Sequence, residues 1–143
     1  MRTFIDLQAL VTFDVDQVQE AFKQRLTFDD TDAATASVVQ SGLVQLAALA
    51  SATPFNFGSV TSASLLIVVA YEEIQLQLNS NTAPLVPVRP IPAAPAGSLF
   101  SRFQRDDQPG LVVWRGKVGS LYLTNPSAVA AASAFVAVVG NAT

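Results

Sequence analysis

The chain has 143 residues, of which 50% are hydrophobic and 13% are charged, and it contains neither cysteine nor histidine. Without cysteine the chain cannot form disulfides or thiolate metal sites, and without histidine it lacks the commonest general base and zinc ligand. A net charge of −3 argues against nucleic-acid binding, which needs a basic face to neutralise phosphates. The length suits one domain, so we expect residues 1–143 to fold as a single unit.

The low charge content is unusual for a soluble domain, in which about a quarter of the residues are normally charged. The mean hydropathy is +0.39, and 19 charged residues must cover the surface of a 15.1 kDa protein. Either apolar side chains are left in water, or neighbouring subunits cover part of the surface. We favour coverage by other chains, because large exposed apolar patches usually mark interaction sites.

No segment of the sequence predicts a membrane span or a secretory signal. The longest apolar runs with few charges, residues 63–71 and 128–139, are shorter than the roughly 18 residues that a spanning helix needs. The first three residues lead into an alternating pattern instead of a basic segment followed by an apolar one. We therefore expect synthesis in a cytoplasm and no membrane partner.

The first 32 residues predict a strand, a helix and a turn. Apolar residues occupy every odd position from Ile5 to Val15, a period of two that indicates a strand with one buried face. Val15, Val18, Phe22 and Leu26 are spaced by three and four, and this spacing predicts a short amphipathic helix over residues 17–25. The acidic residues at 29, 30 and 32 predict a turn.

The rest of the chain predicts short strands separated by turns. Ser41-Gly42 is the two-residue connection expected in a hairpin, and the run 63–70 is apolar at every position except Ser64, as in a strand buried on both faces. We expect a bulge near Gly119. The predicted strands after residue 32 are 36–40, 43–50, 63–70, 73–79, 99–103, 111–115, 118–124 and 133–139. This pattern predicts a mainly β fold, an antiparallel β-sandwich or jelly roll with one short N-terminal helix.

Five prolines lie between residues 84 and 95, and they exclude a central strand or a helix there. Apolar residues lie between these prolines, which distinguishes the segment from a polar linker. Two interpretations stay open. The segment, with its end at about residue 97, is an extended arm that lies on this or a neighbouring subunit, or it is an ordered crossover within the sandwich.

Four residue sets are candidates for catalytic or binding sites. Asp29, Asp30 and Asp32 resemble the start of a calcium loop, but the glycine and the distal glutamate that such a loop needs are missing. Lys23 and Lys117, the two lysines of the chain, lie on the predicted helix and in a predicted turn, where a Ser–Lys pair is disfavoured.

The other two sets are acidic and aromatic. A carboxylate pair could be drawn from Glu72 or Glu73 with Asp106 or Asp107, but adjacent strand residues point to opposite faces. A sugar platform could be drawn from Trp114, Tyr122 and Tyr71, although a tryptophan in an apolar run more often lies in a core. We therefore expect no enzyme activity, no cofactor and no metal site.

Charge is distributed unevenly along the chain. Residues 1–37 contain seven acidic and three basic residues, a net charge of −4, whereas residues 84–143 contain five basic and two acidic residues, a net charge of +3. The basic set is Arg89, Arg102, Arg105, Arg115 and Lys117. Two interpretations stay open, pairing within one molecule or complementary faces on adjacent subunits.

A resemblance adds to this interpretation. The order of strands, the segment SLYLTNPSA from Ser120 to Ala128 and the closing FVAVVG from Phe135 to Gly140 resemble small β-sandwich proteins of tailed-bacteriophage virions. The resemblance is to capsid cement (decoration) proteins and to tail or fibre modules. It implies a non-catalytic subunit, made in a bacterial host and located in the virion, that stabilises the shell by packing on neighbouring subunits.

The partners implied by the resemblance are the major capsid protein or another virion protein, and further copies of the chain, with a trimer favoured. Composition suggests the contact residues, which are Phe4, Ile5, Arg89, Ile91, Arg102, Arg105 and Phe135. The alternative is a tail, fibre or adaptor module that binds a receptor or glycan through loops such as 53–58 and 105–110.

Overall fold

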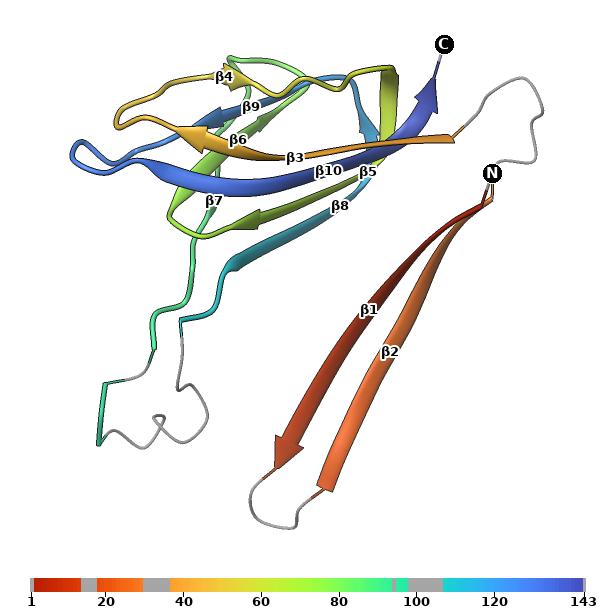
Figure 1. The fold of residues 1–143 in the computed structure, drawn as a ribbon, viewed down its shortest axis with the longest axis vertical. Helices are drawn as coiled ribbons and strands as arrows, with labels where there is room; N and C mark the ends of the chain where they lie inside the picture. Colours follow the sequence, from red (N-terminus) through yellow and green to blue (C-terminus); the bar gives the residue numbers. More distant parts are fainter. Residues whose placement is uncertain (1, 14–17, 30–36, 94, 98–106, 143) are drawn as a thin grey trace. The chain divides into compact units, whose positions relative to one another are not determined.

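The computed structural model describes residues 2–13, 18–29, 37–93, 95–97 and 107–142, and within these ranges it describes side chains from residue 40 to residue 141. The described residues are mainly β, with ten strands and no helix (Figure 1). The chain divides into two compact units, Met1–Ser37 and Val38–Thr143. The single domain that the sequence predicts over residues 1–143 stays a prediction, since each unit is described by itself.

The first unit is a two-stranded antiparallel ribbon. Strand β1 (Arg2–Phe13) pairs with β2 (Val18–Asp29) along their whole length, from Arg2 opposite Asp29 to Phe13 opposite Val18. The strand predicted from Ile5 is confirmed over the described residues.

The predicted helix over residues 17–25 is wrong from Val18 onward, because this stretch lies in β2, and Gln17 lies outside the described residues. The error has a simple origin. A spacing of four residues is one turn of a helix, but it is also two periods of a strand, and the pairing with β1 selects the strand.

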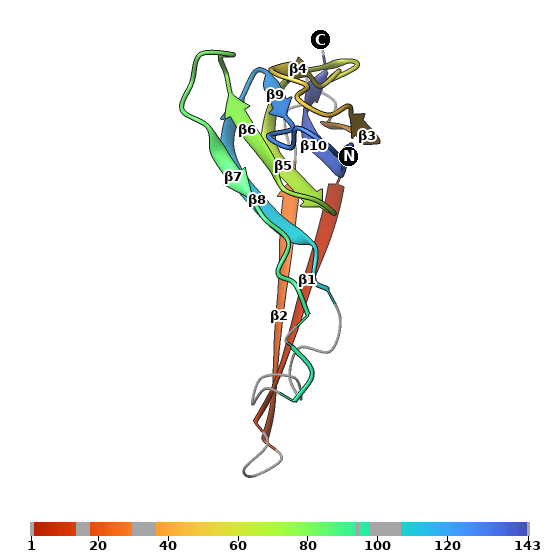
Figure 2. The ribbon, with the colours of Figure 1, turned by 90° about the vertical axis from the view of Figure 1, so that its left-hand side faces the viewer.

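The second unit contains two four-stranded sheets. The first has the order β3 (Ser37–Leu46), β10 (Ala132–Ala142), β5 (Val60–Ala70) and β8 (Gly110–Val118). The second has the order β4 (Thr53–Pro54), β9 (Leu121–Thr124), β6 (Ile74–Leu78) and β7 (Val86–Val88). Figure 2 shows β7 beside β8, where the two sheets come into contact.

The two sheets share one hydrophobic core. Its buried side chains include Val68 and Val136 from the first sheet and Ile74, Leu76 and Leu123 from the second. In β6, Ile74 and Leu76 point into this core. Gln77 is also buried, and its side-chain amide donates hydrogen bonds to the carbonyls of Asn81 (2.7 Å) and Ala83 (2.8 Å).

Three expected turns and breaks differ in the structure. Strand β3 runs without interruption through Ser41-Gly42, so the hairpin predicted there is wrong. Strand β8 likewise continues through the turn predicted at Gly116-Lys117, and Gly116 has a φ of 149°. Near Gly119, where a bulge is expected, the chain passes from one sheet to the other, since β8 ends at Val118 and β9 begins at Leu121. The register shift between β5 and β8 lies just before it, between Arg115 and Val118.

The proline-rich segment contains strand β7, with Pro87 at its centre. Val86 and Val88 pair with Leu76 and Ile74 of β6, and Val88 is buried. A proline is tolerated there because β7 is an edge strand of its sheet. Farther along, Ile91 forms an isolated bridge with Gln108. The strand predicted over residues 99–103 lies outside the described residues.

Candidate protein interface

The outer side of the first sheet carries a continuous set of apolar residues. Phe135 of β10 lies opposite Val69 of β5, which lies opposite Leu111 of β8. The next outward-facing row along the same strands consists of Ala137, Ile67 and Val113. We call these six residues, Ile67, Val69, Leu111, Val113, Phe135 and Ala137, the outer apolar face.

The outer apolar face is partly exposed to solvent in this chain. Leu111 is 59% exposed and Phe135 is 37% exposed, and the other four residues are half-buried. The outer side of an antiparallel sheet is ordinarily polar, because only the inner side contacts the core. The inner positions of β5 and β10 are fully buried, so the outer residues are not needed to fill the core. This arrangement is suited to contact with another protein surface.

Charge is absent from a large part of the second unit. The sequence has no Asp, Glu, Lys or Arg between Asp32 and Glu72, and none after Lys117. These two uncharged stretches supply β3, β4, β5, β9 and β10, which the topology brings together at one side of the two sheets. Within the second unit, the described charged residues lie instead from Glu72 to Lys117, the stretch that includes β7 and β8.

The predicted contact residues fall in different places. Phe135 belongs to the outer apolar face, and Ile91 is exposed on the proline-rich segment. Arg89 pairs with Glu73, with 2.9 Å between Nε and Oε1, and both side chains are largely exposed. An exposed pair of this kind contributes about 0–1 kcal/mol. Phe4 and Ile5 lie in β1 of the first unit, where side chains are not described, and Arg102 and Arg105 lie outside the described residues.

Sequence reasoning missed most of the outer apolar face. Its signal was present in β5 and β8, where apolar residues occupy consecutive positions and so must point to both sides of the sheet. The strand predicted over 63–70 as buried on both faces is wrong on its outer side at Ile67 and Val69, which are only half-buried. An apolar run of this kind predicts that both faces are apolar, but not what covers the second one.

A second candidate site is a pocket of about 370 Å³ between the β5–β6 turn and the loop after β9. Glu72 lies at this pocket, and its Oε2 accepts hydrogen bonds from the backbone N–H (2.7 Å) and hydroxyl (2.8 Å) of Ser133. Glu73 is engaged with Arg89. Asp107, the other described member of the proposed carboxylate set, accepts a hydrogen bond from the Ala93 N–H at 2.7 Å. These carboxylates therefore hold turns and loops in place.

Asn125 also lines the pocket, but it is buried and serves the fold. Its side-chain amide donates to the carbonyls of Ala130 (2.8 Å), Ala47 (2.9 Å) and Leu46 (3.3 Å). Its Oδ1 accepts from the backbone N–H of Ser127, and its own N–H donates to the Ala50 carbonyl. Asn125 thus joins the β3–β4 connection to the loop after β9, and its polar atoms are used within the fold.

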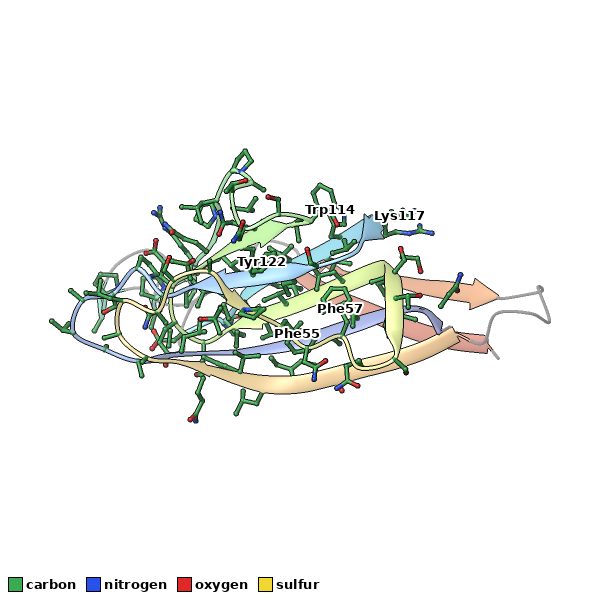
Figure 3. The ribbon with its side chains drawn as sticks, turned by 90° about the horizontal axis from the view of Figure 1, so that it is seen from above. Phe55, Phe57, Trp114, Lys117 and Tyr122 are labelled. Atoms are coloured by element: carbon green, nitrogen blue, oxygen red, sulfur yellow. The ribbon has the colours of Figure 1, made fainter. Side chains whose placement is uncertain are left out.

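The aromatic residues do not form a sugar platform. Trp114 lies on β8 of the first sheet and Tyr122 on β9 of the second (Figure 3), while Tyr71 follows β5. Trp114 pairs with Leu66, so about five residues of strand, roughly 16 Å, separate its level from that of Tyr71. Trp114 is 47% exposed, so the core position expected for it is wrong. Phe55 and Phe57 contact each other edge to face, with ring centroids 6.0 Å apart.

Residues 37–93, 95–97 and 107–142 bring no three acidic side chains together in a way that could hold a metal ion. Of the predicted calcium-loop residues, Asp29 ends β2, and Asp30 and Asp32 lie outside the description. No described helix has the length and apolarity to cross a membrane.

Comparison with protein-family models, curated proteins and solved structures gave no match.

Proposed function

We propose that this chain is a non-catalytic structural subunit of a virion, a cement protein that stabilises a capsid by packing against neighbouring chains. The two sheets with their common core are then the layers of a β-sandwich. The observation that carries the proposal is the outer apolar face, which leaves Leu111 and Phe135 in water on a sheet whose inner side already fills the core.

Energetics support a role in a repeated assembly. A face of about 300 Å² contributes about 7 kcal/mol when it is fully buried, at about 25 cal/mol per Å² of apolar area. Association of two proteins costs about 4–15 kcal/mol, so one such contact roughly breaks even. A subunit with this face gains stable binding when it contacts several neighbours at once, as it does on a shell.

The partners under this proposal are the major capsid protein and further copies of the chain. The phage resemblance of the sequence supports the choice of a capsid and implies trimers. The uncharged stretches support a partner surface that is also apolar, because a charged partner would lose hydration on contact without gaining a counter-charge.

The test is addition of the purified protein to empty shells from the same virus. We expect the wild type to bind and to raise the melting temperature of the shells. Phe135→Asp should bind at least tenfold more weakly, since the carboxylate would be buried against an apolar surface. Gln75→Asp, on the outward side of the second sheet, is the matched control and should bind like the wild type.

Circular dichroism spectra of both variants that match the wild type exclude unfolding as the cause of weaker binding to shells. Equal binding by Phe135→Asp and wild type would refute the role of the outer apolar face. A protein that ignores shells but binds cells or glycans would be a tail, fibre or adaptor module instead.

A further inference from the structure

One edge of the first sheet lacks the features that normally protect an exposed sheet edge. Among the described strands, the edges of the two sheets are β3, β8, β4 and β7. Strand β4 contains Pro54 and β7 contains Pro87, while β8 carries Arg115 and Lys117 on either side of Gly116. Prolines and charged residues at an edge prevent another strand from pairing with it. Strand β3 has none of these features.

Strand β3 is also long and regular. It has ten residues, and its sequence SVVQSGLVQL contains neither proline nor a charged residue. Leu46 is buried and Val44 packs against the core, whereas Ser41, Leu43 and Gln45 are exposed. The inward side chains therefore fix the strand on the core, while one row of its backbone N–H and C=O groups faces away from β10.

We propose that β3 pairs with β3 of a second copy, antiparallel and about a two-fold axis. The first sheets of the two copies then form one eight-stranded sheet. The inference goes beyond the cement function, since it concerns the chain alone and needs no shell. It replaces the trimer implied by the resemblance with a two-fold contact.

The absence of charge on β3 favours a second copy as the occupant. Two identical uncharged strands meet without like-charge contacts in any register, and a two-fold pairing uses the same residues on both copies. Pairing also brings the outer apolar faces of the two copies into one continuous sheet surface, with Leu43 of each copy between them. Leu43 is 60% exposed in the single chain.

The size of the contact sets its strength. Ten residues of strand extend about 34 Å, and a sheet edge about 10 Å thick gives roughly 350 Å² on each copy. Stable interfaces bury about 800 Å² on each partner, so this contact belongs to the weak class. Antiparallel pairing adds roughly ten backbone hydrogen bonds, a number typical of specific interfaces. We therefore expect a specific dimer with a Kd in the micromolar range or weaker.

The test is sedimentation velocity of the full chain over a wide range of concentrations. The wild type should shift reversibly from monomer to dimer. Leu43→Lys should weaken the dimer at least tenfold, because it places two lysines near the axis. Leu85→Lys is the control, since Leu85 is a leucine of similar exposure (48%) beside the protected edge β7, and it should leave the dimer unchanged.

Hydrogen exchange gives a second readout, because the charge introduced in Leu43→Lys does not by itself protect or expose the backbone amides of β3. Exchange of every second amide in β3 should slow as the wild-type dimer forms and should stay fast in Leu43→Lys. A wild type that stays monomeric at millimolar concentration would overturn the proposal. So would a trimer as the smallest assembly, or a dimer that Phe135→Asp abolishes and Leu43→Lys does not. None of these results depends on whether the protein binds shells.

Discussion

Asn125 shows how one buried polar side chain can organise two loops. Its amide group bonds three carbonyls in the segments 46–47 and 130, and its Oδ1 and backbone N–H bond the segments 127 and 50. Asn125 begins the connection between β9 and β10. The burial of Asn125 could not be predicted, because Leu46 and Ala47 are 79 and 78 residues away in the chain.

Replacing Asn125 by alanine should lower the free energy of unfolding by about 3 kcal/mol, because several buried carbonyls and one N–H lose their partner together. Denaturant unfolding measures this loss. Asn56→Ala is the control, since Asn56 is exposed and bonds only locally to the Gly58 N–H, and it should cost under about 1 kcal/mol. A loss at Asn125 no larger than that at Asn56 would show that the loops are held by other contacts.

At the scale of strands, the sequence predicted those with one clear period. Strands β5, β6 and β10 lie where alternation or an apolar run placed them. The errors come from signals that two structures share. Spacing by four residues fits both β2 and a helix, and Ser41-Gly42 fits both a hairpin turn and the middle of β3. In each case, pairing with another strand decides which of the two structures forms. A single sequence does not show which strand that partner is.

Two glycines in strands of the first sheet differ sharply in their surroundings. A Cβ on Gly140 would lie 2.1 Å from the Ser62 carbonyl oxygen, at the register shift between β10 and β5, whereas a Cβ on Gly42 of β3 would meet nothing within 4 Å. We expect Gly140→Ala to destabilise the protein by about 2 kcal/mol or more, since backbone must move.

The same change at Gly42 should be neutral, or stabilising by up to about 1 kcal/mol, because alanine restricts the unfolded chain. Thermal unfolding of both variants checks the difference. Similar melting temperatures for the two variants would contradict the close approach of β10 and β5 at this point.

At the scale of the whole molecule, composition predicted a surface that other chains cover, but not where that surface lies. The low charge content becomes informative when the fold brings the two uncharged stretches together in β3, β5 and β10. The outer apolar face and the β3 edge both belong to this sheet. The sequence placed contacts instead at residues chosen by type, and of these Phe135 belongs to the outer apolar face.

Salt distinguishes an uncharged contact from the charge asymmetry of the sequence. Between 0.1 M and 1 M salt the screening length falls from about 10 Å to about 3 Å. If the acidic residues of 1–37 and the basic residues of 84–143 joined adjacent copies, self-association would weaken several-fold. If they paired within one molecule, salt would lower the unfolding temperature instead.

Pairing through β3 involves no charge, so we expect the dimer to keep its Kd in 1 M sodium chloride and to tighten in sulfate, which favours apolar burial. Sedimentation at the two salt concentrations measures this directly, and a dimer that dissociates at high salt would place the contact on charged residues and away from β3.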